Sequence, residues 1–273
     1  LHCRWVAEHM RRHWDVEVLT TRAHDYITWR NHYPEGETEV NGIPVRRFSV
    51  SKARNPERFG RLQNFVFENE HKESDELAWL DEEGPTSPDL IRHVRARESD
   101  FDVFIFFSYR YYHSYHGIRA LPRKSVLVPT AERDPVIHLK IFKELFRLPR
   151  AFVYNSEEER EMIQTVSGNQ DVPGLVVGVG TEVPAATSAE RFRAKHGIAG
   201  PYVIYIGRTD QNKGCPELFD FFLRLKAQTG SPIKLVLIGN SVLRIPAHPD
   251  IMPLGFLPEE DKFDGLAGAE ALV

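Results

Sequence analysis

Short apolar runs alternate along this chain with segments of helical periodicity, and no other feature limits its possible folds as strongly. A strand in a parallel sheet is a near-continuous run of β-branched and aromatic residues, because helices cover both of its faces. Runs of this kind lie at residues 16–21, 45–50, 103–107, 125–129, 152–154, 175–179, 202–206 and 234–238. The alternation predicts an α/β fold in which mostly parallel sheets are covered by helices.

Capping signals mark the starts of the expected helices. Ser156 is followed by Glu159, and Thr187 by Glu190, and each pair has the spacing of a capping box. Pro216 stands in the first turn of another expected helix, a position that suits proline because the N–H that it lacks has no partner there.

The length of 273 residues is large for one ordinary α/β domain and sufficient for two. We place the boundary between residues 1–184 and 185–273, where Pro184 follows the last strand of the first half. Residues 51–99 are highly charged and interrupt the strand pattern. We expect a helical insertion there, with a turn at Gly84-Pro85.

Both ends of the chain fall inside expected elements. Residues 3–14 carry apolar side chains every three to four positions, which indicates a helix. Residues 269–273 have the composition of a strand that has just begun. Because an α/β lobe normally opens on a strand, we expect the chain to be a fragment cut at both ends, with its second lobe incomplete.

The composition argues against two classes of partner. With a formal net charge of −4 and a sequence pI near 6.3, the chain has no electrostatic reason to bind nucleic acid. No apolar stretch approaches the roughly 18–20 residues of a membrane span, and two distant cysteines indicate free thiols in a reducing compartment. We expect a cytoplasmic protein without a transmembrane segment, and peripheral contact with the cytoplasmic membrane face stays open.

Two glycines and two cations separate the strand at 202–206 from the next expected helix. Gly207 and Arg208 follow the strand directly, and Lys213 and Gly214 precede the helix. Ligands of open α/β sheets bind beyond the carboxyl ends of the strands. Glycine lets the backbone approach a ligand there, while a helix start and the two cations attract anions. The stretch predicts a diphosphate-binding site, and a tight turn with surface charges is the alternative.

Two further glycines continue this pattern. Gly239 ends the run at 234–238, and Gly255 precedes Phe256 a short distance later. In the order and spacing of these motifs, residues 202–273 resemble the start of the donor lobe of glycosyltransferase family 4.

The resemblance implies the GT-B fold, in which two Rossmann-like lobes with parallel sheets face each other. It implies that Arg208 and Lys213 hold the diphosphate of a nucleotide sugar, that the backbone at Gly255 and Phe256 lies against the nucleobase, and that glycines 207, 214 and 239 belong to the same donor site. The implied reaction is a retaining transfer of a sugar to a hydroxyl acceptor. Family members often act in surface polysaccharide or glycolipid synthesis, which implies a sugar or lipid-linked acceptor.

We expect neither a metal ion nor a cofactor at this site. The two cations would neutralise the charge that develops on the leaving nucleoside diphosphate. The Asp-x-Asp sequence at residues 100–102 precedes a strand instead of following one, and we interpret it as a solvated turn.

The first half resembles the acceptor lobe of the family more loosely. Glu132 and Asp134 follow the run at 125–129, where many members carry a histidine and then acidic residues. Glu132 replaces this histidine, which puts a histidine-based role in doubt. Either carboxylate could instead orient an acceptor hydroxyl, and stabilisation of a helix start is the alternative.

Tyr109, Arg110 and His113 follow the run at 103–107, so they belong to the carboxyl end of a strand. Aromatic rings that stack on sugars, together with a cation, suit an acceptor-side pocket. An ordinary surface loop is the alternative.

The paired glutamates by which the family holds the donor sugar and its ribose would follow Val273, so we expect this fragment to be inactive. Two rival interpretations stay open. One is a nucleotide-sugar epimerase of the same fold, and the other is a non-catalytic scaffold that binds a nucleotide without turnover.

Overall fold

A computed structural model describes residues 2–273, apart from the side chain of Asn212. The chain divides into two compact units between Gly180 and Thr181. Residues 177–184, around this division, form neither helix nor strand, and the boundary placed at 184/185 falls at the end of this segment.

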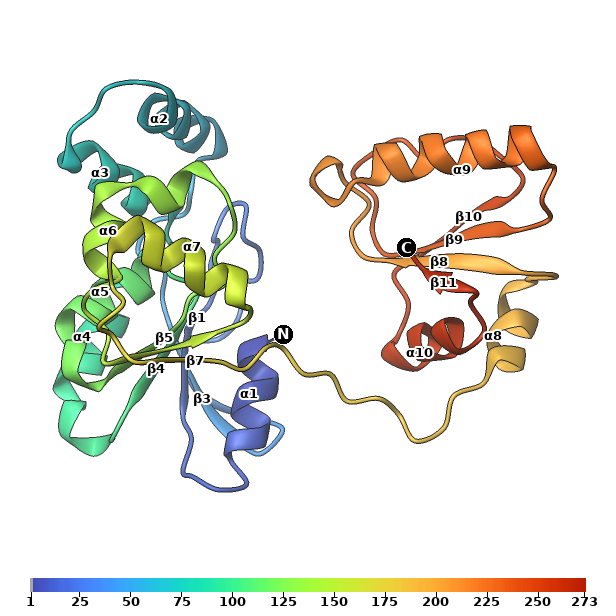
Figure 1. Cartoon of the computed structure of the whole chain (residues 1–273). Helices are drawn as coiled ribbons and strands as arrows, with labels where there is room; N and C mark the ends of the chain where they lie inside the picture. The colour runs from blue at the N-terminus through green and yellow to red at the C-terminus, as the bar shows by residue number, and fades with distance from the viewer. Residues whose placement is uncertain (1) are drawn as a thin grey trace. The chain divides into compact units, whose positions relative to one another are not determined.

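The first unit contains two hydrogen-bonded sheets (Figure 1). The smaller has the strand order β1-β3-β2 and the larger the order β4-β5-β6-β7, with every pair in the larger sheet parallel. The strands are β1 (Val18–Thr21), β2 (Gly36–Val40), β3 (Ile43–Phe48), β4 (Phe104–Phe107), β5 (Ser125–Val128), β6 (Ala151–Tyr154) and β7 (Gly174–Val176). Six of these strands coincide with runs predicted from the sequence.

Strand β2 was not predicted from the sequence. It pairs antiparallel with β3, and its sequence is polar and largely exposed, so it has no apolar run. The turn between the two strands holds Asn41 and Gly42, with φ of 52° and 78°. Asn-Gly is the preferred pair for a two-residue hairpin turn, and this dipeptide was the available signal.

Helices connect and cover these strands. They are α1 (His2–Met10), α2 (Pro56–Glu68), α3 (Glu73–Glu83), α4 (Pro88–Ala96), α5 (Tyr112–Ala120), α6 (Lys140–Leu145) and α7 (Glu157–Ser167), with short 3-10 turns η1 (Glu98–Asp100), η2 (Pro122–Lys124) and η3 (Pro135–His138). Three of them, α2 to α4, occupy the segment expected as a helical insertion, and Gly84-Pro85 lies between α3 and α4 as expected. Ser156 caps α7 by accepting a hydrogen bond from the Glu159 N–H at 3.1 Å.

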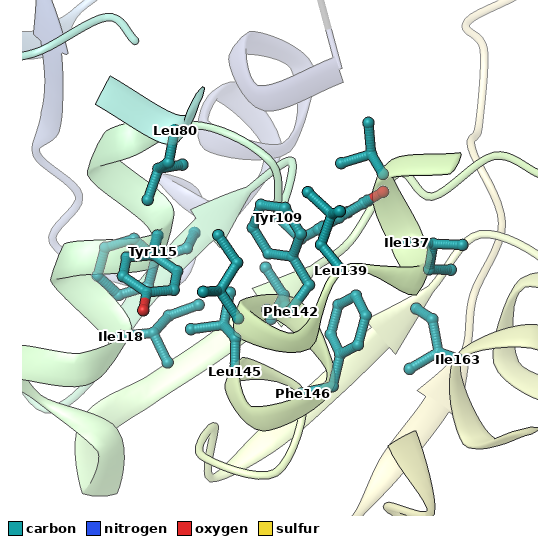
Figure 2. Packing of buried hydrophobic residues seen from close by; sticks show 14 of the residues in the cluster. Leu80, Tyr109, Tyr115, Ile118, Ile137, Leu139, Phe142, Leu145, Phe146 and Ile163 are labelled. Carbon is teal, nitrogen blue, oxygen red and sulfur yellow. The ribbon is translucent and has the colours of Figure 1, made fainter. Parts of the chain in front are cut away.

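The core of the first unit is rich in aromatic rings (Figure 2). The ring of Tyr109 lies 4.9 Å from that of Phe142 and 5.1 Å from that of Phe146, and Tyr109 is only 1% exposed. Tyr115 packs against Phe142 as well. The Tyr109 ring is therefore unavailable for stacking on a sugar, and only its hydroxyl group reaches toward the strand ends.

The second unit is built on one parallel sheet of order β10-β9-β8-β11. Its strands are β8 (Tyr202–Ile206), β9 (Lys234–Ile238), β10 (Ile251–Gly255) and β11 (Ala271–Leu272), and its helices are α8 (Ala189–His196), α9 (Cys215–Thr229) and α10 (Glu259–Ala267), with the 3-10 turn η4 (Gln211–Lys213). Helix α9 lies on one face of the sheet, and α8 and α10 lie on the other (Figure 1). Two apolar clusters accordingly fill the two faces.

The start of α8 corrects one sequence prediction. Ser188, and not Thr187, caps the helix by accepting a hydrogen bond from the Arg191 N–H at 3.2 Å. The Ser188 N–H in turn donates to the buried carboxylate of Asp264 on α10 at 2.7 Å. This tertiary contact anchors the capping residue to α10.

Candidate functional site

Three glycines lie together at the carboxyl ends of β8, β9 and β10. The Gly207 N–H donates to the Ile238 carbonyl at 2.9 Å, and the Gly239 N–H donates to the Gly255 carbonyl at 2.7 Å. A Cβ atom on Gly239 would stand 2.1 Å from the Gly207 carbonyl oxygen, and the φ of Gly239 is +135°. Only glycine fits this position, so backbone lines the strand edge where ligands of α/β sheets bind.

Arg208 follows this edge and is oriented by an acidic neighbour. Its Nε donates to the Asp210 carboxylate at 2.5 Å, and its Nη2 contacts the same group. The Arg208 side chain is 46% exposed, whereas that of Asp210 is 7% exposed. A buried carboxylate thus holds one end of a solvent-accessible guanidinium. Asp210 was not among the residues predicted for the donor site, although it lies only two residues after Arg208.

Tyr205 supports the same loop from the sheet. Its hydroxyl donates to the Arg208 carbonyl at 2.9 Å, and burial raises the pKa of Tyr205 to about 12. The phenol therefore stays protonated at neutral pH and remains a donor.

Lys213 and Gly214 bring a cation to the start of α9. Lys213 ends η4, and Gly214 adopts the left-handed conformation with φ of +70° and caps the 15-residue helix. The first amides of a helix carry partial positive charge. With Gly214 in this conformation, α9 begins directly after η4, at the end of the short segment that follows β8 and Arg208.

Phe256 leaves β10 directly after Gly255. Its ring is 73% exposed, and the Lys262 ammonium nitrogen lies 5.0 Å from the ring centroid. The ring is therefore free on one face for a planar ligand. Across the described residues, no group of three or more His, Cys, Asp or Glu side chains has a geometry that could hold a metal ion. In the Asp-x-Asp sequence, Asp100 pairs with Arg97 at 2.9 Å.

The first unit has a polar cleft of about 190 Å³ at the carboxyl ends of β4 and β5. The structure brings four of the residues predicted for the acceptor side into its lining, namely Tyr109, Arg110, Glu132 and Asp134. Ser108 and Thr130 line it as well, and both have positive φ, 65° and 48°. Strained backbone of this kind concentrates at functional sites.

Arg110 organises the cleft. Its Nη1 donates to the Asp134 carboxylate at 3.1 Å, and its Nε donates to the Glu83 carboxylate at 2.6 Å. The Tyr109 hydroxyl lies 3.5 Å from the other oxygen of Asp134. Asp134 is therefore fixed in place, while Glu132 is exposed at the cleft.

Two buried glutamates, Glu83 and Glu159, complete this region. Neither was predicted for the acceptor side, and Glu159 was named only as the partner of Ser156 in a capping box. Glu83, with a side chain 5% exposed, also pairs with Arg54 at 2.7 Å. Glu159 accepts hydrogen bonds from the Ala131 and Asn155 N–H groups, both at 2.6 Å, and so ties the loop after β5 to the loop after β6. The contacts of Glu83 with Arg54 and Arg110, and that of Glu159 with Ala131, each span more than twenty residues, and no local pattern in the sequence identifies them.

His113 does not line the cleft. It lies in the first turn of α5, stacked on Tyr111 at 6.0 Å, and its Nδ1 is buried without a hydrogen-bond partner. Burial lowers the pKa of His113 to about 4. An imidazole held neutral in this way is a packing element of the first unit.

Acidification from pH 7 to pH 5 is expected to destabilise the first unit by about 2 kcal/mol through His113. The unfolded chain protonates this histidine below about pH 6.5, and the folded unit does so only near pH 4. The stabilisation is thus complete above pH 6.5 and is lost as the pH falls toward 4. Urea unfolding followed by tryptophan fluorescence measures it, since all four tryptophans lie in this unit.

The variant His113→Gln is the control for this pH dependence. Between pH 7 and pH 5 its free energy of unfolding should fall by about 2 kcal/mol less than that of the unmodified chain. The pH dependence that remains should include the contribution of His116, whose pKa burial also lowers to about 4. An unchanged slope in His113→Gln would show that this histidine is not held neutral.

Comparison with solved structures shows which fold this is. HepE of Anabaena, in complex with UDP and glucose, matches 85% of this chain with a TM-score of 0.57 at 15% sequence identity. Sucrose-phosphate synthase of Thermosynechococcus elongatus matches 97% of it with a TM-score of 0.63 at 13% identity. The α,α-trehalose 6-phosphate synthase of Burkholderia multivorans matches 95% with a TM-score of 0.50 at 12% identity. The chain has the GT-B fold of glycosyltransferases.

The chain spans only part of the length of these proteins: 61% of HepE, 66% of the sucrose-phosphate synthase and 68% of the trehalose 6-phosphate synthase. No protein-family model matches the sequence, and no curated protein matches it. In the described part of the chain, no helix combines the length and the apolar character needed to cross a membrane.

Proposed function

We propose that this chain belongs to a glycosyltransferase that moves a sugar from a nucleoside diphosphate sugar to a hydroxyl acceptor. The observation that carries the proposal is the edge of the second unit, where Gly207, Gly239 and Gly255 expose backbone beside Arg208. The start of α9 follows in the same loop. The GT-B fold supports the proposed glycosyl transfer, and so does the solved complex of HepE with UDP and glucose.

Each part of this edge has a proposed role toward the donor. Arg208 and Lys213, with the first amides of α9 after Gly214, hold the diphosphate and stabilise the charge that develops on it as the sugar leaves. The exposed ring of Phe256 and the backbone of Gly255 lie on the nucleobase side. Metal-free catalysis and a retaining outcome are part of the same proposal.

The polar cleft of the first unit is the proposed acceptor side. Asp134 is positioned by Arg110 at 3.1 Å, and it and the exposed Glu132 are the carboxylates available to orient an acceptor hydroxyl. Arg110 and the Tyr109 hydroxyl fix that geometry. Synthesis of a surface polysaccharide or glycolipid in the cytoplasm would employ such a reaction.

Replacement of Arg208 or Lys213 by alanine is expected to weaken binding of a nucleoside diphosphate by about 1.5–3 kcal/mol, which is roughly 10- to 150-fold. Calorimetric titration of the 273-residue chain with UDP, GDP and ADP measures the affinity and identifies the base. Arg224→Ala is the matched control, because Arg224 is an exposed arginine on α9 that pairs with Asp220. It should bind like the unmodified chain.

A double variant separates loss of the cation from the effect of its partner. In Arg208→Ala the buried Asp210 carboxylate loses its contact with the guanidinium but keeps its negative charge near the proposed phosphate site, and Asp210→Asn removes that charge. Weak binding that persists in Arg208→Ala/Asp210→Asn supports direct contact between Arg208 and the diphosphate. If no nucleotide binds, the strand edge is only a turn. Binding without formation of a glycoside by the full-length enzyme would favour the scaffold, and release of an isomerised nucleotide sugar would favour the epimerase.

A further inference from the structure

A second and larger hollow lies beside the polar cleft of the first unit. This groove has a volume of about 890 Å³, within the range of small-molecule sites, and its walls come from α2, α3, η3 and α7. Its apolar lining includes Val66, Phe67, Leu139, Met162 and Val166. A groove of this kind can remove a sizeable apolar group from water.

The groove and the polar cleft share one residue, Asp134, which lines both. Arg133 and Pro135 on either side of it also line the groove. On the side of the polar cleft, Arg110 Nη1 donates to the Asp134 carboxylate at 3.1 Å and holds it in place. One molecule can therefore place a hydroxyl at Asp134 while its remaining part extends along the apolar walls.

The charges around the groove disfavour an anionic ligand. Its titratable lining residues are Glu76, Asp134, Glu158, Glu161, Arg133, His71 and His138. Two of the carboxylates are already engaged, since Glu76 accepts from the Lys140 and Ile141 N–H groups and from His71, and Asp134 accepts from Arg110. The exposed carboxylates of Glu158 and Glu161 then outnumber the one permanent cation, Arg133.

We infer that this groove binds the apolar aglycone of an uncharged acceptor, a glycoside with an alkyl or aryl tail whose sugar hydroxyl reaches Asp134. The inference rests on the proposed glycosyl transfer and narrows its acceptor class from any hydroxyl compound to a neutral amphiphile. An acceptor with a phosphate next to its tail would meet Glu158 and Glu161 and bind less well.

Binding of three probes to the 273-residue chain tests the groove without turnover. Saturation-transfer NMR titrations would compare n-octyl β-glucoside below its micelle concentration, methyl β-glucoside and n-octyl phosphate. Octyl glucoside is expected to bind about tenfold or more tighter than methyl glucoside, because burial of only two methylenes gives this factor. Octyl phosphate should bind more weakly than octyl glucoside.

A charge placed in the groove locates the site. Thr165 lines the groove and is exposed on α7, so Thr165→Arg should lower octyl glucoside affinity about tenfold without disturbing the core. Gln164→Arg is the matched control, since Gln164 is the adjacent residue of the same helix and is absent from the groove lining. UDP affinity should stay the same in both variants.

The outcomes separate this inference from the proposed function. Equal affinity for octyl and methyl glucoside, or no effect of Thr165→Arg, would overturn the groove assignment even if UDP binds as expected. Binding to phospholipid vesicles in place of octyl glucoside would overturn it in favour of a membrane-facing surface. Octyl glucoside binding together with a failure of every nucleotide to bind would remove the acceptor role, because the donor reaction would then be absent.

Discussion

Replacement of Glu83 by alanine is expected to lower the free energy of unfolding of the first unit by about 3–5 kcal/mol. Glu83 lies between Arg54 at 2.7 Å and Arg110 at 2.6 Å, and the side chains of Glu83 and Arg54 are only 5% and 8% exposed. Removal of the carboxylate leaves the Arg54 guanidinium buried without its counter-charge. Urea unfolding at pH 7, followed by tryptophan fluorescence, reports on this unit alone.

Two further variants serve as controls for Glu83→Ala. Glu70→Ala removes an exposed carboxylate of the same unit and should change stability by less than about 0.5 kcal/mol. Glu83→Gln keeps hydrogen-bonding oxygen but loses the charge, so its cost should fall between the two. If Glu83→Ala unfolded like Glu70→Ala, the two arginines would be solvated in solution, and the positioning of Arg110 over Asp134 would lose its main support.

The variant Gly239→Ala is expected to destabilise the second unit by about 3–5 kcal/mol and to abolish nucleotide binding. The methyl group would stand 2.1 Å from the Gly207 carbonyl oxygen, and the φ of +135° is unfavourable for any residue with a Cβ atom. Strained backbone and overpacking each cost about 1–3 kcal/mol. Hydrogen exchange of peptides covering β8 and β9 should show protection lowered by more than about 100-fold.

Gly230→Ala is the matched control for this substitution. Gly230 also has positive φ, at 60°, but a Cβ atom there would meet nothing within 4 Å, so the expected cost is only about 1 kcal/mol. Equal destabilisation by the two variants would mean that backbone conformation alone matters at residue 239. The close approach of β8 and β9 at the candidate donor site would then contribute nothing to the destabilisation by Gly239→Ala.

The buried strands could be predicted from the sequence because burial on both faces leaves a local mark. The runs at 202–206 and 234–238 coincide with β8 and β9, since a parallel strand under two layers of helices has no polar face. Strand β2 is different, because it lies at the edge of its sheet and is largely exposed. Only its Asn41-Gly42 turn distinguished it from a loop.

The candidate donor edge was predictable for the same reason. Glycines that directly follow a strand are adjacent to it in sequence, so the predicted runs at 202–206 and 234–238 suffice to assign Gly207 and Gly239 to the carboxyl ends of strands. No run was predicted before Gly255, which the structure places at the end of β10. The acceptor side was less predictable. Tyr109 and His113 follow β4 as expected, yet the ring of the first belongs to the core and the second is half-buried outside the cleft lining.

The sequence by itself determined the α/β class, the positions of the buried strands and the glycine-lined strand edge with Arg208. These depend on periodicity and on short-range order. Only the tertiary structure decided which carboxylates position the cleft, since Glu83 meets Arg110 across 27 residues and Glu159 meets Ala131 across 28. It also decided that a large apolar groove adjoins Asp134. Such contacts form because burial forces each charge to find a partner, and the partner is whatever side chain the fold places there.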